Sequence, residues 1–162
     1  MTNPMLEPTR SRPDIPVEYG VPPTDEGMLD WSWVTDQLKK ARNYWLITTY
    51  PDGRQHCIPS WGAWVENSLY FSGGDMTRHA KNLVTNREMI AHLESGDQVV
   101  IVHGTAEPAT NVPAEIMSKI EADYVAKYGM GEGATYRLVP HKVLAWTNFL
   151  TTATRFLFNP KS

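Results

Sequence analysis

The sequence predicts a mainly β fold with flanking helices, in which about seven short strands form an antiparallel sheet that closes into a small barrel. Three turns of hairpin type separate apolar segments, at residues 51–54, 66–67 and 95–97. Hairpin turns join antiparallel strands. Glycine and proline interrupt several strands, and short bent strands favour closure of a sheet. The 162 residues most simply form one domain.

The first 29 residues are predicted to form a proline-rich arm, and residues 30–162 the barrel domain. Half of the chain's 12 prolines lie in the arm. Proline has no N–H group to donate and fixes its own φ angle, which excludes the arm from helices and from central strands. Two interpretations stay open: a mobile tail, or an extended strap that lies across the surface of a partner.

Three segments have the pattern of helices. Residues 31–42 follow Asp30, which can cap a helix, and residues 77–86 form a short second helix. A third helix begins at Pro113, because proline suits the first helical turn. Basic residues crowd the end of the first helix, where they complement the helix dipole or receive an acidic ligand tail: Lys39, Lys40 and Arg42.

The strands are expected at residues 44–50, 55–66, 68–72, 87–94, 98–106, 136–146 and 153–158. The second of them contains Pro59 and Gly62, so it bends or carries a bulge there. A bend of this kind leaves backbone N–H and C=O groups free for a ligand. Pro59, Ser60 and Trp61 therefore have two interpretations: a strand bend with a core tryptophan, or a wall that hydrogen-bonds the edge of a heterocycle.

Composition argues against several classes of function. A formal net charge of −3 and a pI of about 5.9 argue against a nucleic-acid partner, which requires a basic surface. Cys57 is the only cysteine, so no internal disulfide can form. No apolar run approaches the ~18 residues that span a membrane, and the first residues lack the apolar core of a secretion signal. We expect a soluble, cytoplasmic protein without a membrane partner.

Covalent and metal chemistry lack their sequence signatures. The five histidines have neither the spacing nor the neighbouring carboxylates of a metal site. Ser60 does not lie in a G-x-S-x-G turn, and the chain has neither a G-x-G-x-x-G nor a P-loop motif. We therefore expect no metal, and we expect a bound cofactor to carry any redox chemistry.

A short basic segment follows the third strand and opens the second helix. Arg78, Lys81 and the Thr77 hydroxyl can bind phosphate oxygens, and the free N–H groups of a helix start favour an anion. His79 can donate a hydrogen bond to the same phosphate. The alternative is a solvated helix end with ordinary surface charges. Cations at a helix start are unfavourable unless an anion lies there, which favours the phosphate interpretation.

The last strand carries Arg155 close to aromatic residues. An arginine in this setting can stack on a ring or pair with an acid. The alternative is a final barrel strand with one outward charge.

Several segments, in this order and spacing, resemble the pyridoxamine 5′-phosphate oxidase-like proteins, the split β-barrel superfamily that binds FMN or the deazaflavin coenzyme F420. They are ARNYWLITTYPDGRQHCIPSWGAW, LYFSGG, TRHAKNL, VVIVHGTAE and TRFLF, and the resemblance runs from about Trp31 to Phe158. It implies an antiparallel split β-barrel of roughly six to seven strands. It also implies a homodimer with the cofactor sites at the interface. His79 replaces a lysine of the family pattern, and His103 replaces a glutamate.

The resemblance further implies which residues form the cofactor site. The flavin-type ring would lie against the strand at Pro59, Ser60 and Trp61. The phosphate would lie at the start of the second helix, and one or two residues of the other subunit would approach the ring. The complete set is Pro59, Ser60, Trp61, Thr77, Arg78, His79, Lys81, Asn82, Trp146 and Arg155.

The expected function is an F420- or FMN-dependent oxidoreductase that passes a hydride to a small conjugated organic substrate. No residue is an obvious catalytic group, and protonation from solvent, Tyr44, His56 or Arg155 stays open. F420 carries an acidic tail that the basic end of the first helix could receive, and on this ground we favour F420 over FMN. Two alternatives remain: a non-catalytic protein that stores or carries a cofactor or a haem-type ligand, and a structural dimer whose barrel is filled by side chains.

Overall fold

The computed structural model describes residues 7–131 and 133–158, and it confirms a mainly β fold with flanking helices. Its strands are β1 (Thr9–Ser11), β2 (Tyr44–Thr49), β3 (Gln55–Ser60), β4 (Ala63–Val65), β5 (Ser68–Phe71), β6 (Glu88–His92), β7 (Val99–Pro108), β8 (Tyr136–Trp146) and β9 (Thr154–Leu157). Its helices are α1 (Trp31–Lys40), α2 (Arg78–Thr85), α3 (Ala114–Tyr128), α4 (Phe149–Thr152) and the short 3-10 helix η1 (Val17–Tyr19). Within this part of the chain, no helix combines the length and the apolar character needed to cross a membrane.

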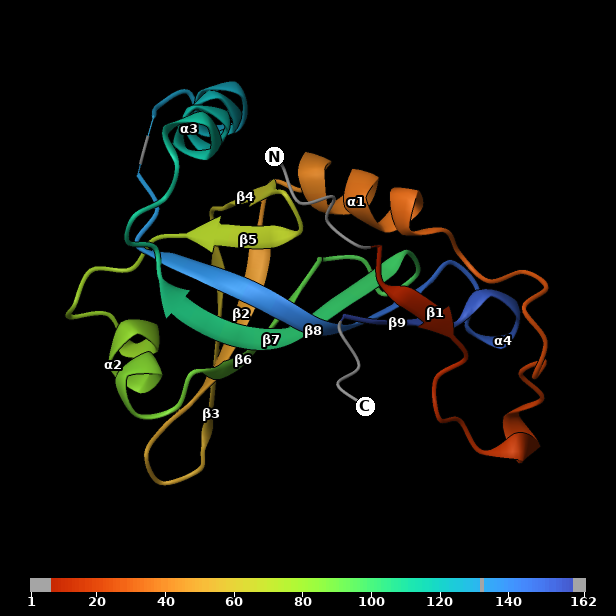
Figure 1. The fold of residues 1–162 in the computed structure, drawn as a ribbon. Coiled ribbons are helices and arrows are strands. Elements are labelled where there is room, and N and C mark those ends of the chain that lie inside the picture. The colour runs from red at the N-terminus through yellow and green to blue at the C-terminus, as the bar shows by residue number, and fades with distance from the viewer. Residues whose placement is uncertain (1–6, 132, 159–162) are drawn as a thin grey trace.

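All strand pairs are antiparallel, and the sheet has the order β1-β9-β8-β7-β6-β2-β3. The short β4–β5 hairpin joins this sheet through β5, which pairs with the start of β8. Strand β8 therefore serves both parts of the barrel. In Figure 1, α2 and α3 lie at one end of the molecule, and β1, β9 and α4 lie at the other.

The described residues contain more strands than the sequence predicts, for two reasons. The strand expected at residues 55–66 is divided at the bend after Ser60 into β3 and β4. In the arm, β1 pairs with β9, with Arg10 opposite Phe156. A proline-rich segment can form an edge strand because only one side of that strand needs ladder hydrogen bonds. The predicted bend and the exclusion of the arm from central strands both agree with this arrangement.

The arm packs against its own chain through two arginines. Arg10 Nη1 donates to Asp30 Oδ1 at 2.9 Å, so Asp30 stands at the N-cap position of α1 but its side chain binds the arm instead of capping the helix. Arg12 donates to the backbone carbonyl oxygens of Thr24, Glu26, Thr151 and Ala153. These contacts fit an extended strap, but one that lies on this chain. The domain boundary at residue 29 stays a prediction.

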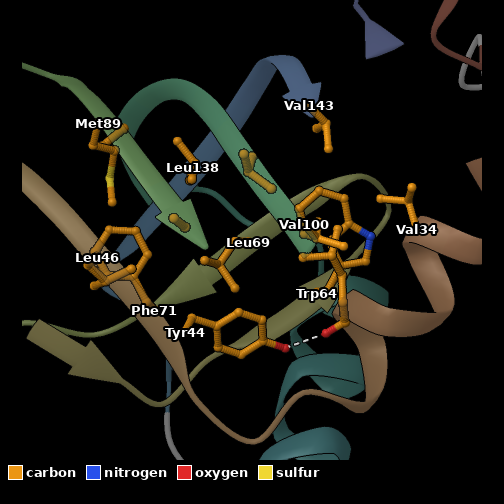
Figure 2. Packing of buried hydrophobic residues seen from close by; sticks show 14 of the residues in the cluster. Val34, Tyr44, Leu46, Trp64, Leu69, Phe71, Met89, Val100, Leu138 and Val143 are labelled. Atoms are coloured by element: carbon orange, nitrogen blue, oxygen red, sulfur yellow. Dashed lines mark hydrogen bonds between the residues drawn. The ribbon is translucent and has the colours of Figure 1, made fainter. Parts of the chain in front are cut away.

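The inner face of the sheet packs the main hydrophobic core. Strand β2 shows the alternation: Tyr44, Leu46 and Thr48 are buried, whereas its other side chains are only half-buried. Figure 2 shows Tyr44 and Leu46 among core residues from β5, β7 and β8, with Val34 of α1 beside them. The outer face of the sheet keeps half-buried apolar side chains.

Candidate functional site

The short basic segment that the sequence predicts lies at the start of α2. Thr77 stands at the N-cap position, where its Oγ1 accepts a hydrogen bond from Ala80 N at 3.4 Å. Arg78 begins the helix, and its guanidinium lies 4.8 Å from the centre of the Tyr50 ring. Lys81 is exposed. Among the described residues neither Arg78 nor Lys81 forms an ion pair, so both charges are available to an anion.

Two predicted members of the site, His79 and Asn82, point into the protein. The Nε2 atom of His79 lies 3.2 Å from the carbonyl oxygen of Ser72. Asn82 is fully buried and donates from Nδ2 to Thr48 Oγ1 at 3.1 Å. Burial lowers the pKa of His79 below its usual value, and the nearby His56 adds to this effect. The expected hydrogen bond from His79 to a phosphate outside the helix therefore gains no support from this arrangement.

Unpaired polar atoms gather on the inner side of α2. Among the described residues, His56 Nδ1, His79 Nδ1 and Asn82 Oδ1 are buried without a hydrogen-bond partner. They belong to one region, because His56 pairs in register with Thr48 and the Asn82 amide binds the Thr48 hydroxyl. Buried polar groups are rarely unsatisfied. Because each of these atoms is closed to bulk solvent, an ordered internal water is the partner that fits this region.

Trp61 follows directly after the C-terminal end of β3, and it is not a core residue. Its side chain is 38% exposed, and its ring stacks on Tyr128 with the centroids 4.4 Å apart and 6° between the planes. The bend after Ser60 is present, but the expectation that Trp61 belongs to the core is wrong. β3 is also the last strand in the order of the sheet, so half of its backbone groups point away from β2 and are free for a ligand.

The last turn of α3 contacts the bend that follows Ser60 and holds it in place. The hydroxyl of Tyr128 donates to Arg42 O at 2.6 Å and accepts from Gly62 N at 3.0 Å. The ammonium group of Lys127 donates to Gly62 O at 2.9 Å. Sequence analysis missed both α3 residues, because the pattern of a helix does not indicate which distant strand bend its last turn will contact.

Tyr44 is one of the proton sources left open by the sequence, and its hydroxyl is buried and fully hydrogen-bonded within the protein. Its hydroxyl donates to Leu38 O at 2.6 Å and accepts from Lys127 Nζ at 3.1 Å. Burial raises the pKa of Tyr44 far above its usual value. This environment does not suit an acid that must release a proton near neutral pH.

The two parts of the site lie at opposite ends of the β2–β3 pair. His56 pairs with Thr48 near α2, whereas Ser60 pairs with Tyr44 near Trp61. Four residues of extended strand span about 13 Å. A ligand with its phosphate at α2 and its ring at Trp61 would therefore be elongated and lie along β3.

The basic end of α1 lies close to Trp61, at the end of β3 that is far from α2. The Arg42 guanidinium is 5.4 Å from the centre of the Tyr128 ring, and it also binds the carbonyl of Lys127. An acidic tail that continues beyond a phosphate at α2 would run away from Arg42. The argument that this end of α1 favours F420 over FMN therefore loses its support.

Trp146 and Arg155 lie on strands of the same sheet that are distant from β3. Arg155 donates to Ser11 Oγ at 3.1 Å and to Asp14 Oδ2 at 2.9 Å, so the arm holds it. In the order of the sheet, β9 is five steps from β3. At about 4.8 Å per step this is roughly 24 Å along the sheet. A single chain therefore does not bring Arg155 to Trp61.

A cavity of about 600 Å³ opens on the outer face of the sheet. Its lining is mainly apolar and comes from β6, β7 and the turn between them, with Trp146 at one side. His92 and His103 also line this cavity. Across residues 7–131 and 133–158, no three His, Cys, Asp or Glu side chains are grouped to hold a metal ion. Sequence analysis assigned no ligand role to either histidine.

Solved structures of other proteins share this fold. A Listeria innocua protein described as a candidate pyridoxamine 5′-phosphate oxidase is 14% identical with a TM-score of 0.57, over 72% of this chain and 98% of that chain. An FAD binding protein from Mycobacterium smegmatis is 18% identical with a TM-score of 0.53, over 81% and 98%. The heme storage protein HutZ from Vibrio cholerae is 13% identical with a TM-score of 0.56, over 71% and 93%. No family model and no curated protein matches the sequence.

Proposed function

Because the chain has the split β-barrel fold of the pyridoxamine 5′-phosphate oxidase-like proteins, we propose that it binds a flavin-type cofactor along β3 and is an oxidoreductase. The observation that carries the proposal is the start of α2. There, cations without ion-pair partners, a helix N-terminus and buried polar atoms without hydrogen bonds occur together within the described residues. The cations and the helix start suit a phosphate.

In this proposal, the residues at the two ends of β3 bind different parts of the cofactor. Arg78 and Lys81 would bind the phosphate by charge-assisted hydrogen bonds. The Thr77 hydroxyl donates its one hydrogen to Gly74 O at 2.8 Å, so Thr77 would contribute by capping the helix start beside the phosphate. Trp61, stacked on Tyr128, would support the ring. When bound, the flavin supplies the hydride transfer to a small conjugated substrate, and the chain supplies its position. The buried Tyr44 hydroxyl donates to Leu38 O and therefore does not serve as the proton donor in this proposal.

We further propose that two copies of the chain complete each site. Pro59 and Arg155 lie at opposite edges of the outer face, too far apart to serve one ligand in one chain. A twofold axis through the middle of this face would place β8 and β9 of one copy over β2 and β3 of the other. Trp146 and Arg155 would then approach the ring from the second copy. The half-buried apolar side chains of the outer face would be covered at the same time.

Within this proposal FMN is favoured over F420. FMN would need only a phosphate site at α2 and a ring site on β3, whereas the basic end of α1 lies at the wrong end for the acidic tail of F420. The proposal also locates the protein in the cytoplasm, where an exposed free thiol such as Cys57 stays reduced.

The first experiment is a titration of the purified full chain with FMN and with F420, followed by flavin fluorescence and absorption. Arg78→Ala combined with Lys81→Ala should raise the dissociation constant for FMN by more than about tenfold, since one charged hydrogen bond contributes roughly 1.5–3 kcal/mol. The matched control is Lys39→Ala with Lys40→Ala on the exposed end of α1. Binding of neither cofactor to the wild-type chain, or an equal loss in the control, would overturn the proposal.

A second candidate function is storage or transport of a haem-type ligand without catalysis. It is favoured by the apolar cavity of about 600 Å³ with two imidazoles in its lining. The likeness of the fold to HutZ, described as a heme storage protein, agrees with this candidate. Tight binding of haem with no turnover across a panel of conjugated substrates would favour storage over catalysis.

A further inference from the structure

We propose that the outer-face cavity binds an iron porphyrin and that Nε2 of His92 ligates the iron. This inference rests on the second candidate function and adds the residue that ligates the iron. The cavity does not include the start of α2, where the flavin phosphate would lie, but it shares Trp146 with the ring end of the proposed flavin site.

The hydrogen bonding of His92 leaves the correct nitrogen free. Its Nδ1 lies 2.7 Å from the carbonyl oxygen of Leu93. A carbonyl oxygen can only accept, so the hydrogen is on Nδ1 and the neutral ring keeps its lone pair on Nε2. A histidine that donates from one nitrogen to a backbone carbonyl is the usual arrangement for metal ligation through the other.

The neighbours of His92 on the sheet fix its ring. His92 pairs with Trp45 of β2 on one side and with Ile101 of β7 on the other. The indole of Trp45 and the imidazole are nearly parallel, with 5° between the planes and 6.3 Å between the centroids. An imidazole held between two large neighbours loses little further freedom when it binds a ligand.

The cavity has the polarity that a porphyrin requires. Ile90, Ile101 and Trp146 provide apolar walls for a flat macrocycle. Lys142 pairs in register with His103 across β7 and β8, and it forms no ion pair within residues 7–131 and 133–158. Lys142 does not itself line the cavity, but as the register partner of His103 its ammonium group would be available to a porphyrin carboxylate that extends beyond the lining. Burial and Lys142 lower the pKa of His103, so this second imidazole is neutral at neutral pH.

The test is a haem titration of the full chain, followed by the Soret absorption band. The wild-type chain should give a shifted, saturable Soret band. His92→Gln keeps an amide N–H for Leu93 O but lacks the ligating nitrogen, and it should raise the dissociation constant for haem by about tenfold or more. His92→Ala should lose the same band and regain it on addition of imidazole. His141→Ala is the matched control, because His141 is exposed and does not line this cavity.

Metal-free protoporphyrin separates ligation from simple apolar binding. Its fluorescence titration should be the same for the wild-type chain and for His92→Gln, because this ligand has no iron to bind. The proposal is overturned if the wild-type chain gives no Soret shift, if His92→Gln keeps the wild-type band, or if His141→Ala loses it equally. Titration of the same samples with FMN reports on the flavin proposal independently, since no residue at the start of α2 is changed.

Discussion

Tyr128 shows how a single hydroxyl can hold two distant segments together. It links the loop before β2 to the bend after β3 through Arg42 O and Gly62 N, while its ring supports Trp61. We predict that Tyr128→Phe keeps the stacked ring but lowers the free energy of unfolding by about 1–3 kcal/mol, because the part-buried N–H of Gly62 loses its acceptor. Urea denaturation followed by tryptophan fluorescence measures this change.

Tyr19→Phe is the control for this prediction. Tyr19 is 59% exposed, and its ring meets the edge of Phe149, so loss of its hydroxyl should change the unfolding free energy by less than about 0.5 kcal/mol. Equal effects of the two substitutions would show that the Tyr128 hydroxyl does not fix the bend.

His79 should make stability depend on pH. Burial holds its folded pKa below the usual value of 6.5, so the unfolded chain takes up a proton that the folded chain resists. Stability should therefore be full above about pH 6.5 and should fall as the pH drops toward the folded pKa, by at most ~1.4 kcal/mol per unit for one proton. In His79→Gln this slope between pH 5 and 8 should be smaller, with the part due to His103 remaining. An unchanged slope in urea unfolding would contradict the burial argument.

At the scale of single residues, local sequence signals predicted the start of α2 well and the Trp61 wall only in part. A helix start near Thr77 with the charges of Arg78 and Lys81 beside it was predictable from signals within one turn, whereas the N-cap role of Thr77 appears only in the structure. The inward direction of His79 and the stacking of Trp61 on Tyr128 depend on tertiary packing. No pattern within a few residues encodes such contacts.

Among the elements, β7 carries a bulge that a glycine makes possible. Its register with β8 shifts between His103 and Gly104. A Cβ atom at position 104 would collide with Val139 O and lie 2.8 Å from Leu138 Cδ1. We predict that Gly104→Ala destabilises the fold by roughly 1–3 kcal/mol or more, measured by thermal and urea unfolding.

Gly96→Ala provides the matched comparison for this substitution. Position 96 lies in the turn before β7 and has nothing within 4 Å of an added Cβ, so the change should be close to neutral or slightly stabilising. If both alanine variants unfold at the same denaturant concentration, close packing at position 104 does not limit the strand.

The elements were predictable to different degrees. Helices and strands with clear periodicity, such as β2 and α2, lie within one or two residues of their expected bounds. The short β1 was not predicted, because three residues in a proline-rich arm become a strand only through pairing with β9. The division of the second expected strand followed the bend that its proline and glycine indicated.

At the scale of the molecule, the outer face of the sheet links all the proposals. It carries the apolar cavity with His92 and the predicted residues Trp146 and Arg155, and Pro59 lies at its opposite edge. Sequence analysis predicted the fold class, because alternation and turn signals determine which strands pair. It could not place these residues on one face, since their position depends on the strand order and on the register of every intervening pair.

Complementation between two variants tests most directly whether a flavin site is shared by two chains. Arg78→Ala with Lys81→Ala removes the phosphate contacts of a chain, and Arg155→Ala removes the contact that it offers to its partner. Each variant alone should bind FMN weakly. After mixing and random reassortment, about one site in four should be intact and bind FMN with wild-type affinity. Arg155→Ala that binds FMN like the wild-type chain, or a mixture that binds no better than its components, would contradict a site built by two copies along β3.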